Sequence, residues 1–278
     1  MKRGMDRREF VQTMTAIGAA TVFCRPPRVA KIDKIGIQLY TVRDKMKEDV
    51  EATLAHIAQI GYKEVEFAGY FGHPPDHIRG YLDKNGLTAP STHVAYENDE
   101  QWKAALATAK TVGHEYIVMP WIPEERRKTL DDWKKFAEVF NHAAQMAHDA
   151  GLQFAYHNHD FEFPKMDGQV PYDVLLQSTD PKLVQLEIDL YWITKAGADP
   201  LAYFARWPGR IPLVHVKDSA GPPDNKMVDV GQGKIDWKRI FAKRDQAGIK
   251  HFFVEHDQPP QGFQDVAVSY TYLKNLEF

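Results

Sequence analysis

Short apolar runs alternate with longer amphipathic stretches from Lys34 to the end of the chain. The apolar runs are predicted to be strands, and they cover residues 34–40, 63–69, 87–95, 115–120, 152–158, 183–189, 211–217 and 251–257. Between them, apolar residues recur at the three- and four-residue spacing of helices. The clearest predicted helices cover 49–61 and 129–151, each closed by a glycine. Shorter helices are expected near 76–85, 99–112, 171–178, 199–207, 236–247 and 263–275.

Eight strand–helix units in a chain of 278 residues predict an α/β protein with a single (β/α)8 TIM barrel. A doubly wound open sheet is the weaker alternative. No low-complexity linker or shift of composition divides the chain after residue 31, so residues 31–278 are expected to form one domain.

The composition limits the kind of partner. The net charge of −3 provides no basic surface for a nucleic-acid backbone, so we expect no nucleic acid as partner. The single cysteine, Cys24, excludes an internal disulfide and a cysteine-based zinc site. Twelve histidines leave imidazole and carboxylate as the available metal ligands.

The first 30 residues differ from the rest. They contain a basic start, the pair Arg7 and Arg8, and a weakly apolar run, which together are similar to a twin-arginine export signal. The alternative is a mildly basic leader with an accidental arginine pair. The apolar run is too short for a stable membrane anchor. A functional signal would place the protein in the periplasm, and without one it would be cytoplasmic.

Residues able to bind a metal lie at the ends of the last four predicted strands. His157 ends the fifth, Asp189 the sixth, His215 the seventh and Glu255 the eighth. His159 and Lys217 lie beside them, at the ends of the fifth and seventh strands. In a TIM barrel these ends converge over one mouth, where active sites lie. Taken singly, a histidine at a strand end is usually a packed core or rim residue, and an aspartate there usually caps a helix. Four such residues at four consecutive strand ends predict a divalent metal site.

The first half of the barrel provides candidates for substrate contact. Gln38 and Tyr40 end the first strand, Glu66 the second and His93 the third. Trp121 and Trp192 are placed to stack on a sugar ring or to pack at the rim. For Glu66 the alternative is a solvent-facing strand residue, and for Lys217 it is an exposed ion pair with Asp218.

Five motifs follow one another between residues 156 and 258: YHNHDFEF, EIDLYW, HVKD, VGQGKIDW and FFVEHDQ. With these motifs in this order, the chain resembles the xylose isomerase-like TIM barrel family. This is the sugar phosphate isomerase/epimerase superfamily, which includes the family 2 type of AP endonuclease. The resemblance implies one metal ion held by His157, Asp189, His215 and Glu255. Many members have a glutamate at the end of the fifth strand, so His159 and Glu162 stay open as alternatives to His157.

The resemblance implies a metal-dependent sugar isomerase or epimerase that moves a proton next to a carbonyl. The expected catalytic residues are Glu255, Lys217 and a partner base. The partner base is either His159 or Glu162. Histidine in place of the glutamate also suits a lyase that acts by β-elimination or dehydration on a 3-keto-glycoside or inosose-like substrate. A non-catalytic exported sugar-binding barrel is the third possibility.

Manganese is the first choice of metal, with zinc, cobalt, iron and magnesium as alternatives. We expect the substrate to be an unphosphorylated sugar, keto-sugar or glycoside. A homo-oligomer is possible, because dimers and tetramers are common among relatives. VGQGKIDW is expected to form a tight loop beside the mouth, with Asp236 capping the following helix.

Overall fold

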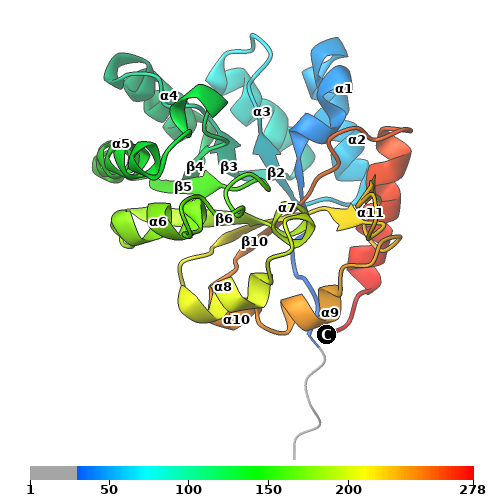
Figure 1. Cartoon of the computed structure of the whole chain (residues 1–278). Coiled ribbons are helices and arrows are strands. Elements are labelled where there is room, and N and C mark those ends of the chain that lie inside the picture. The colour runs from blue at the N-terminus through cyan, green and yellow to red at the C-terminus, as the bar shows by residue number, and fades with distance from the viewer. Residues whose placement is uncertain (1–29) are drawn as a thin grey trace, which may run out of the picture. The chain divides into compact units, whose positions relative to one another are not determined.

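The computed structural model describes residues 30–278, in which eight parallel strands close into a barrel (Figure 1). Its strand order is β1-β10-β7-β6-β5-β4-β3-β2, so neighbours along the chain are neighbours in the barrel apart from a two-stranded insertion. The strands are β1 (Gly36–Gln38), β2 (Glu64–Phe67), β3 (Thr88–His93), β4 (Tyr116–Met119), β5 (Gln153–His157), β6 (Val184–Asp189), β7 (Leu213–Val216) and β10 (His251–Val254). The predicted (β/α)8 barrel is confirmed, and each strand lies within its predicted range.

Helices form the outer ring of the barrel (Figure 1). They are α2 (Val50–Ile60), α3 (Pro75–Asn85), α4 (Asp99–Val112), α5 (Leu130–Asp149), α6 (Pro171–Ser178), α8 (Pro200–Arg206), α9 (Trp237–Phe241), α10 (Arg244–Ala247) and α11 (Phe263–Asn275). The long α5 begins with a capping box, in which the side chains of Thr129 and Asp132 each accept the other's backbone N–H. The prediction of a single helix over 236–247 was wrong. Lys243 leaves the helical conformation and separates α9 from α10.

Several short elements in the loops were not predicted. These are η1 (Leu39–Val42), α1 (Arg43–Glu48), η2 (Glu124–Arg126), α7 (Leu190–Lys195) and the hairpin of β8 (Asp218–Ser219) with β9 (Met227–Val228). Each is too short to show a hydrophobic period in the sequence. The two that follow β1 nevertheless contribute Tyr40 and Arg43 to the wall of a cavity at the carboxyl ends of the strands.

The barrel interior is apolar at mid-height and polar at both ends. Side chains alternate in and out along each strand, and Val118, Ala155, Leu213 and Phe253 fill the middle as part of a separate buried cluster. Gly36 leaves space for this packing, since a Cβ there would lie 2.6 Å from the Phe253 ring. The apolar layer separates polar residues at the amino ends of the strands from those at the carboxyl ends.

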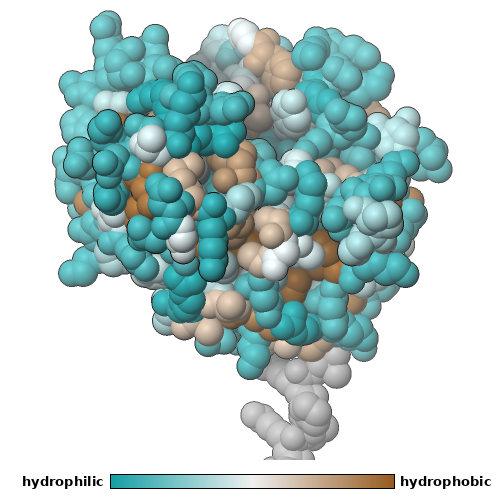
Figure 2. Space-filling model, in the orientation of Figure 1, coloured by the Kyte–Doolittle hydropathy of each residue, from teal (hydrophilic) through white to brown (hydrophobic). Residues whose placement is uncertain are grey.

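Residues Lys31–Phe278 form one compact unit. Hydrophilic side chains cover most of the face shown in Figure 2, with apolar residues gathered in recessed places between them. Within residues 30–278, no helix has the length and apolar character needed to cross a membrane. The predicted export signal lies outside the described residues.

Candidate functional site

A cavity of about 600 Å³ opens at the carboxyl ends of the strands. Its lining combines polar groups from strand ends with residues of the surrounding loops, and includes Tyr40, Arg43, His93, Trp121, His157, His159, Lys217, Glu255 and Asp257. Three of the four predicted metal-binding strand ends therefore contribute directly to the cavity wall, and β6 contributes the buried Asp189 beneath it.

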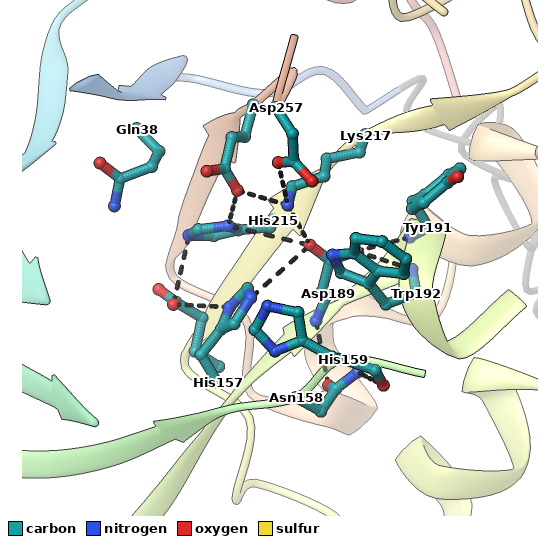
Figure 3. A network of polar contacts seen from close by, with 12 residues as sticks. Gln38, His157, Asn158, His159, Asp189, Tyr191, Trp192, His215, Lys217 and Asp257 are labelled. Carbon is teal, nitrogen blue, oxygen red and sulfur yellow. Dashed lines mark hydrogen bonds and ion pairs between the residues drawn. The ribbon is translucent and has the colours of Figure 1, made fainter. Parts of the chain in front are cut away.

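The predicted metal ligands come together. Ligand atoms of Asp189, His215 and Glu255 lie within 4.8 Å of one another (Figure 3). His157 joins them through Nε2, which lies 3.8 Å from Asp189 Oδ2, while His215 Nδ1 lies 3.9 Å from the same oxygen. Ligand atoms each about 2.1 Å from one ion are separated by up to about 4.2 Å. The spacings of 3.8 and 3.9 Å around Asp189 Oδ2 therefore suit a shared ion.

A buried carboxylate oxygen supports the fit of a cation. Asp189 Oδ1 accepts the N–H groups of Tyr191 and Trp192 and so caps α7, which turns Oδ2 away from the helix. Oδ2 accepts no hydrogen bond, although Lys217 Nζ lies 3.0 Å away. Buried oxygens without donors are costly unless a cation satisfies them. Mixed nitrogen and oxygen ligands favour a divalent transition ion over calcium.

A second polar layer lies beneath these ligands. Glu187 Oε2 is 2.6 Å from His93 Nε2, 3.1 Å from His157 Nδ1 and 3.2 Å from His215 Nε2. These four residues also have ligand atoms within 4.8 Å of one another. The role of Glu187 was missed from the sequence. Its signal was its position two residues before Asp189, since strand alternation points both side chains into the barrel.

Gln38 and Glu66 belong to this buried layer, which corrects their expected contact with substrate. Both are fully buried, and Gln38 Nε2 donates to Glu66 Oε2 at 2.8 Å. Glu66 also accepts from Ser91 and bonds His215 Nε2 at 2.6 Å. Since neither side chain lines the cavity, a substrate cannot reach them without disrupting these bonds.

Lys217 is buried and surrounded by acids. Its Nζ lies 2.7 Å from Glu255 Oε2, 2.9 Å from Asp257 Oδ1 and 3.0 Å from Asp189 Oδ2. The alternative of an exposed pair with Asp218 is wrong, because Asp218 points to the other side of the strand and binds the VGQGKIDW loop. Burial alone would lower the pKa of Lys217, but Asp189 and Glu255 outweigh it and raise the pKa well above its ordinary value.

Opposite charges shift the pKa values of the neighbouring groups. Burial opposes the charged form of His93, yet Glu66 and Glu187 raise its pKa to about 9. The pKa of His215 is also well above its usual value, because Glu187 and Glu255 outweigh burial. For Asp189, burial is the largest effect, and it raises the pKa to about 6. The floor of the cavity therefore holds a network of charged pairs.

The HNH segment places its residues in different surroundings. Burial lowers the pKa of His159 to about 3, so its ring is neutral, and its Nδ1 has no partner. Asn158 turns away and accepts the backbone N–H of Asp189, which ties the ends of β5 and β6 together. Glu162 is fully buried, accepts from Tyr156 and from the backbone N–H of His159, and does not line the cavity. Glu162 is therefore not placed to act as a base or as a ligand, contrary to the expected alternative.

The aromatic candidates also differ from one another. Tyr40 and Trp121 are 44% and 47% exposed at the cavity rim, where they can contact a substrate. Trp192 is not an open platform, since Lys195 Nζ lies 4.3 Å and Lys217 Nζ 5.6 Å from its ring centroid. Its buried Nε1 has no partner.

The VGQGKIDW loop is organised by Asp218. Its carboxylate accepts the backbone N–H groups of Gly231, Gly233 and Ile235 and the Nε1–H of Trp237. The expected helix cap is present, because Asp236 accepts the N–H of Arg239 at the start of α9. The loop is thus held tightly next to Lys217.

A model of the xylose isomerase-like TIM barrel family matches residues 54–271. The chain is 25% identical over 264 residues to an inosose dehydratase of Geobacillus kaustophilus strain HTA426. The alignment covers 81% of this chain and 84% of the relative. Inosose dehydratases of Lacticaseibacillus casei also match.

Among solved structures, a sugar phosphate isomerase/epimerase of Parabacteroides distasonis ATCC 8503 superimposes with a TM-score of 0.78 at 30% identity. The match covers 87% of this chain and 98% of that one. The IolI protein, solved with a bound zinc atom, has a TM-score of 0.69 at 18% identity over 86% of this chain and 96% of its own, which shows the fold alone.

Proposed function

The chain belongs to the xylose isomerase-like TIM barrel family, and we propose that it is a lyase that acts with one divalent metal ion. The reaction removes water, or another oxygen leaving group, from a polyhydroxy ketone such as an inosose or a 3-keto-glycoside. The dehydratase names of relatives that match most of the chain support this reaction over simple epimerisation.

One observation of the site supports elimination in particular. Two unlike groups line the same cavity, the imidazole of His159, whose Nδ1 has no hydrogen-bond partner, and the amine of Lys217. Elimination needs a base for the carbon-bound proton and an acid for the departing oxygen, which these two groups provide. Epimerisation through a matched pair of carboxylates would need a second acid where β5 instead ends in His157.

In the proposed reaction His159 takes the proton from the carbon next to the ketone. The C–O bond at the following carbon breaks, and Lys217 donates a proton to the departing oxygen. The products are water, or an alcohol, and a ketone conjugated with a new C=C bond, with no change of oxidation state overall. Asp189, His215, Glu255 and His157 would hold the metal ion, which supplies electrostatic stabilisation for negative charge on the ketone oxygen.

An unphosphorylated substrate suits the cavity. Its cationic lining residues are Arg43, Lys217 and His93, and the last two are already paired with acids. Arg43 donates to the Tyr40 carbonyl and stacks on the Tyr40 ring. The site therefore lacks the cluster of free cations that would hold a phosphate.

The test is to incubate the metal-loaded enzyme with an inosose and with a 3-keto-glycoside in D₂O and to analyse the products by mass spectrometry. Elimination gives a product that has lost water or the aglycone. A product of unchanged composition that carries deuterium would instead support the second candidate, an isomerase or epimerase, which the name of the Parabacteroides structure favours.

A matched pair of variants identifies the base. We expect His159→Asn to abolish elimination, and His148→Asn, at an exposed position on α5, to leave it unchanged. Full activity of His159→Asn would refute the assigned base. Absence of any reaction in the wild type with each metal would favour the binding-barrel alternative.

We also propose export by the twin-arginine route, on the basis of Arg7, Arg8 and the apolar run that follows. Replacing both arginines by lysine should retain the full-length protein in the cytoplasmic fraction. Equal distribution of wild type and variant between fractions would contradict this proposal.

A further inference from the structure

Each of the two predicted histidine ligands has one ring nitrogen near a buried glutamate that is not a predicted ligand and the other near the remaining predicted ligands. His157 Nδ1 lies 3.1 Å from Glu187 Oε2, and His215 Nε2 lies 2.6 Å from Glu66 Oε2. The opposite nitrogens, His157 Nε2 and His215 Nδ1, face Asp189 Oδ2 at 3.8 and 3.9 Å. His215 Nδ1 also lies 2.6 Å from Oε2 of Glu255, another predicted ligand. Each imidazole thus lies between a buried glutamate and the predicted ligands, and Figure 3 shows both rings next to Asp189.

We propose that Glu187 and Glu66 are positioning residues that fix which nitrogen of each histidine binds the metal ion. Glu187 accepts a proton held on His157 Nδ1, and Glu66 accepts one held on His215 Nε2. His157 Nε2 and His215 Nδ1 are then left as lone-pair donors toward one point. This inference rests on the proposed function, because it concerns the metal ion used there. A carboxylate behind a ligating histidine both orients the ring and strengthens it as a ligand.

The buried layer is built to hold these two carboxylates still. Glu66 is anchored by Gln38 and Ser91 in addition to His215. His93 lies between the two acids, with Nε2 2.6 Å from Glu187 Oε2 and 3.2 Å from Glu66 Oε2. Its ring stacks on that of His215, with centroids 5.3 Å apart and planes 2° apart. The carboxylates are therefore fixed before an ion arrives.

The same atoms allow a competing assignment, in which His93, His157, Glu187 and His215 hold an ion of their own. That arrangement would use His157 Nδ1 and His215 Nε2 as ligands. Both nitrogens lie within hydrogen-bond distance of a buried glutamate that does not line the cavity, whereas His215 Nδ1 bonds Glu255, which lines the cavity and is a predicted ligand. We therefore assign Glu187 and Glu66 to hydrogen bonds.

The test measures Zn²⁺ affinity without substrate, by competition with a chromophoric chelator, and Zn²⁺ stoichiometry by elemental analysis. The variants are Glu187→Ala and Glu187→Gln, with Glu64→Gln as the control. Glu64 is also a buried glutamate that contacts a histidine, His251 at 2.8 Å, but at the amino end of the barrel.

We expect Glu187→Ala to bind one Zn²⁺ about 10–100-fold more weakly than the wild type. Glu187→Gln should lose less, because its amide oxygen still accepts the His157 N–H, and Glu64→Gln should lose nothing. Wild-type affinity in Glu187→Ala would overturn the proposal. A fall from two bound ions to one in that variant would overturn it in favour of the separate inner ion site.

If Glu187→Ala does not fold, long-range ¹⁵N NMR of the Zn²⁺-loaded wild type provides the answer. Ring protons on His157 Nδ1 and His215 Nε2 support the proposal, and the opposite positions overturn it. A wild type that binds no divalent ion overturns both this inference and the metal-dependent function. The expected affinity series without any elimination activity would refute the proposed function alone.

Discussion

Replacing Asp218 by asparagine is predicted to be among the costly single-atom changes in this barrel. Its carboxylate is buried and serves as the acceptor at the centre of the loop after β7. Oδ1 accepts two backbone N–H groups, those of Ser219 at 2.8 Å and Ile235 at 3.3 Å. Oδ2 accepts three donors, the backbone N–H groups of Gly231 at 2.9 Å and Gly233 at 3.2 Å and the indole N–H of Trp237 at 3.0 Å. Every partner is a donor, so both oxygens must be acceptors.

The size of the effect follows from these contacts. Asparagine replaces one oxygen by an NH₂ group, and in either orientation this group faces at least two donors. Hydrogen bonds to a charged acceptor contribute roughly 1.5–3 kcal/mol each, so the loss of two costs about 3–6 kcal/mol. The loop cannot shift easily to compensate, because Gly233 packs directly against the Asp218 carboxylate. A protein of marginal stability would lose a large part of its free energy of unfolding.

Urea unfolding followed by circular dichroism measures this loss. Asp236→Asn is the matched control, because Asp236 accepts only the Arg239 N–H as a cap on an exposed helix end, and we expect it to cost about 1 kcal/mol. An Asp218→Asn cost no larger than that of the control would refute the reasoning. It would mean that the loop reorganises around the amide.

Three further predictions concern the cavity. The first is His93→Gln in metal-free protein. The pKa of His93 is raised to about 9, so protonated His93 stabilises the fold fully below pH 6.5, and this stabilisation disappears as the pH rises through 9. The difference in free energy of unfolding between wild type and variant should therefore be about 3 kcal/mol smaller at pH 10 than at pH 6. Urea titrations of both proteins across this range check the prediction. Lys217→Met, which removes one cation from buried acids, should lower the free energy of unfolding by about 3–5 kcal/mol, and a cost below 1 kcal/mol would show that water compensates. Trp121→Ala should raise KM for a keto-glycoside with an aromatic aglycone more than for an inosose, since Trp121 is exposed at the rim and can stack on the second ring.

The barrel and most of the ligand group could be predicted from the sequence because both depend on short-range regularities. Strand ends converge in this fold, and alternation points Asp189, His215 and Glu255 inward. Alternation would also have excluded the pair of Lys217 with Asp218, since adjacent strand residues point to opposite faces.

The depth of each residue in the barrel could not be predicted in the same way. Gln38 and Glu66 point inward as expected, but they lie one layer below the cavity and bind each other. Their depth depends on the strand register and on which neighbouring side chains are small. Ser91 pairs in register with Glu66 and has room to donate to it, and sequence spacing alone does not show this.

The two ends of β2 show how position in the barrel decides what a chemical pair can do. Glu64 and Glu66 both point inward and each contacts a histidine, His251 at the amino end and His215 at the carboxyl end. Phe253 lies between the two histidines, with its ring centroid 6.2 Å from each. At the amino end the pair lies away from the cavity, on the other side of the apolar layer. At the carboxyl end the same pair lies beneath open ligand atoms and a cavity, so its hydrogen bond can orient a ligand.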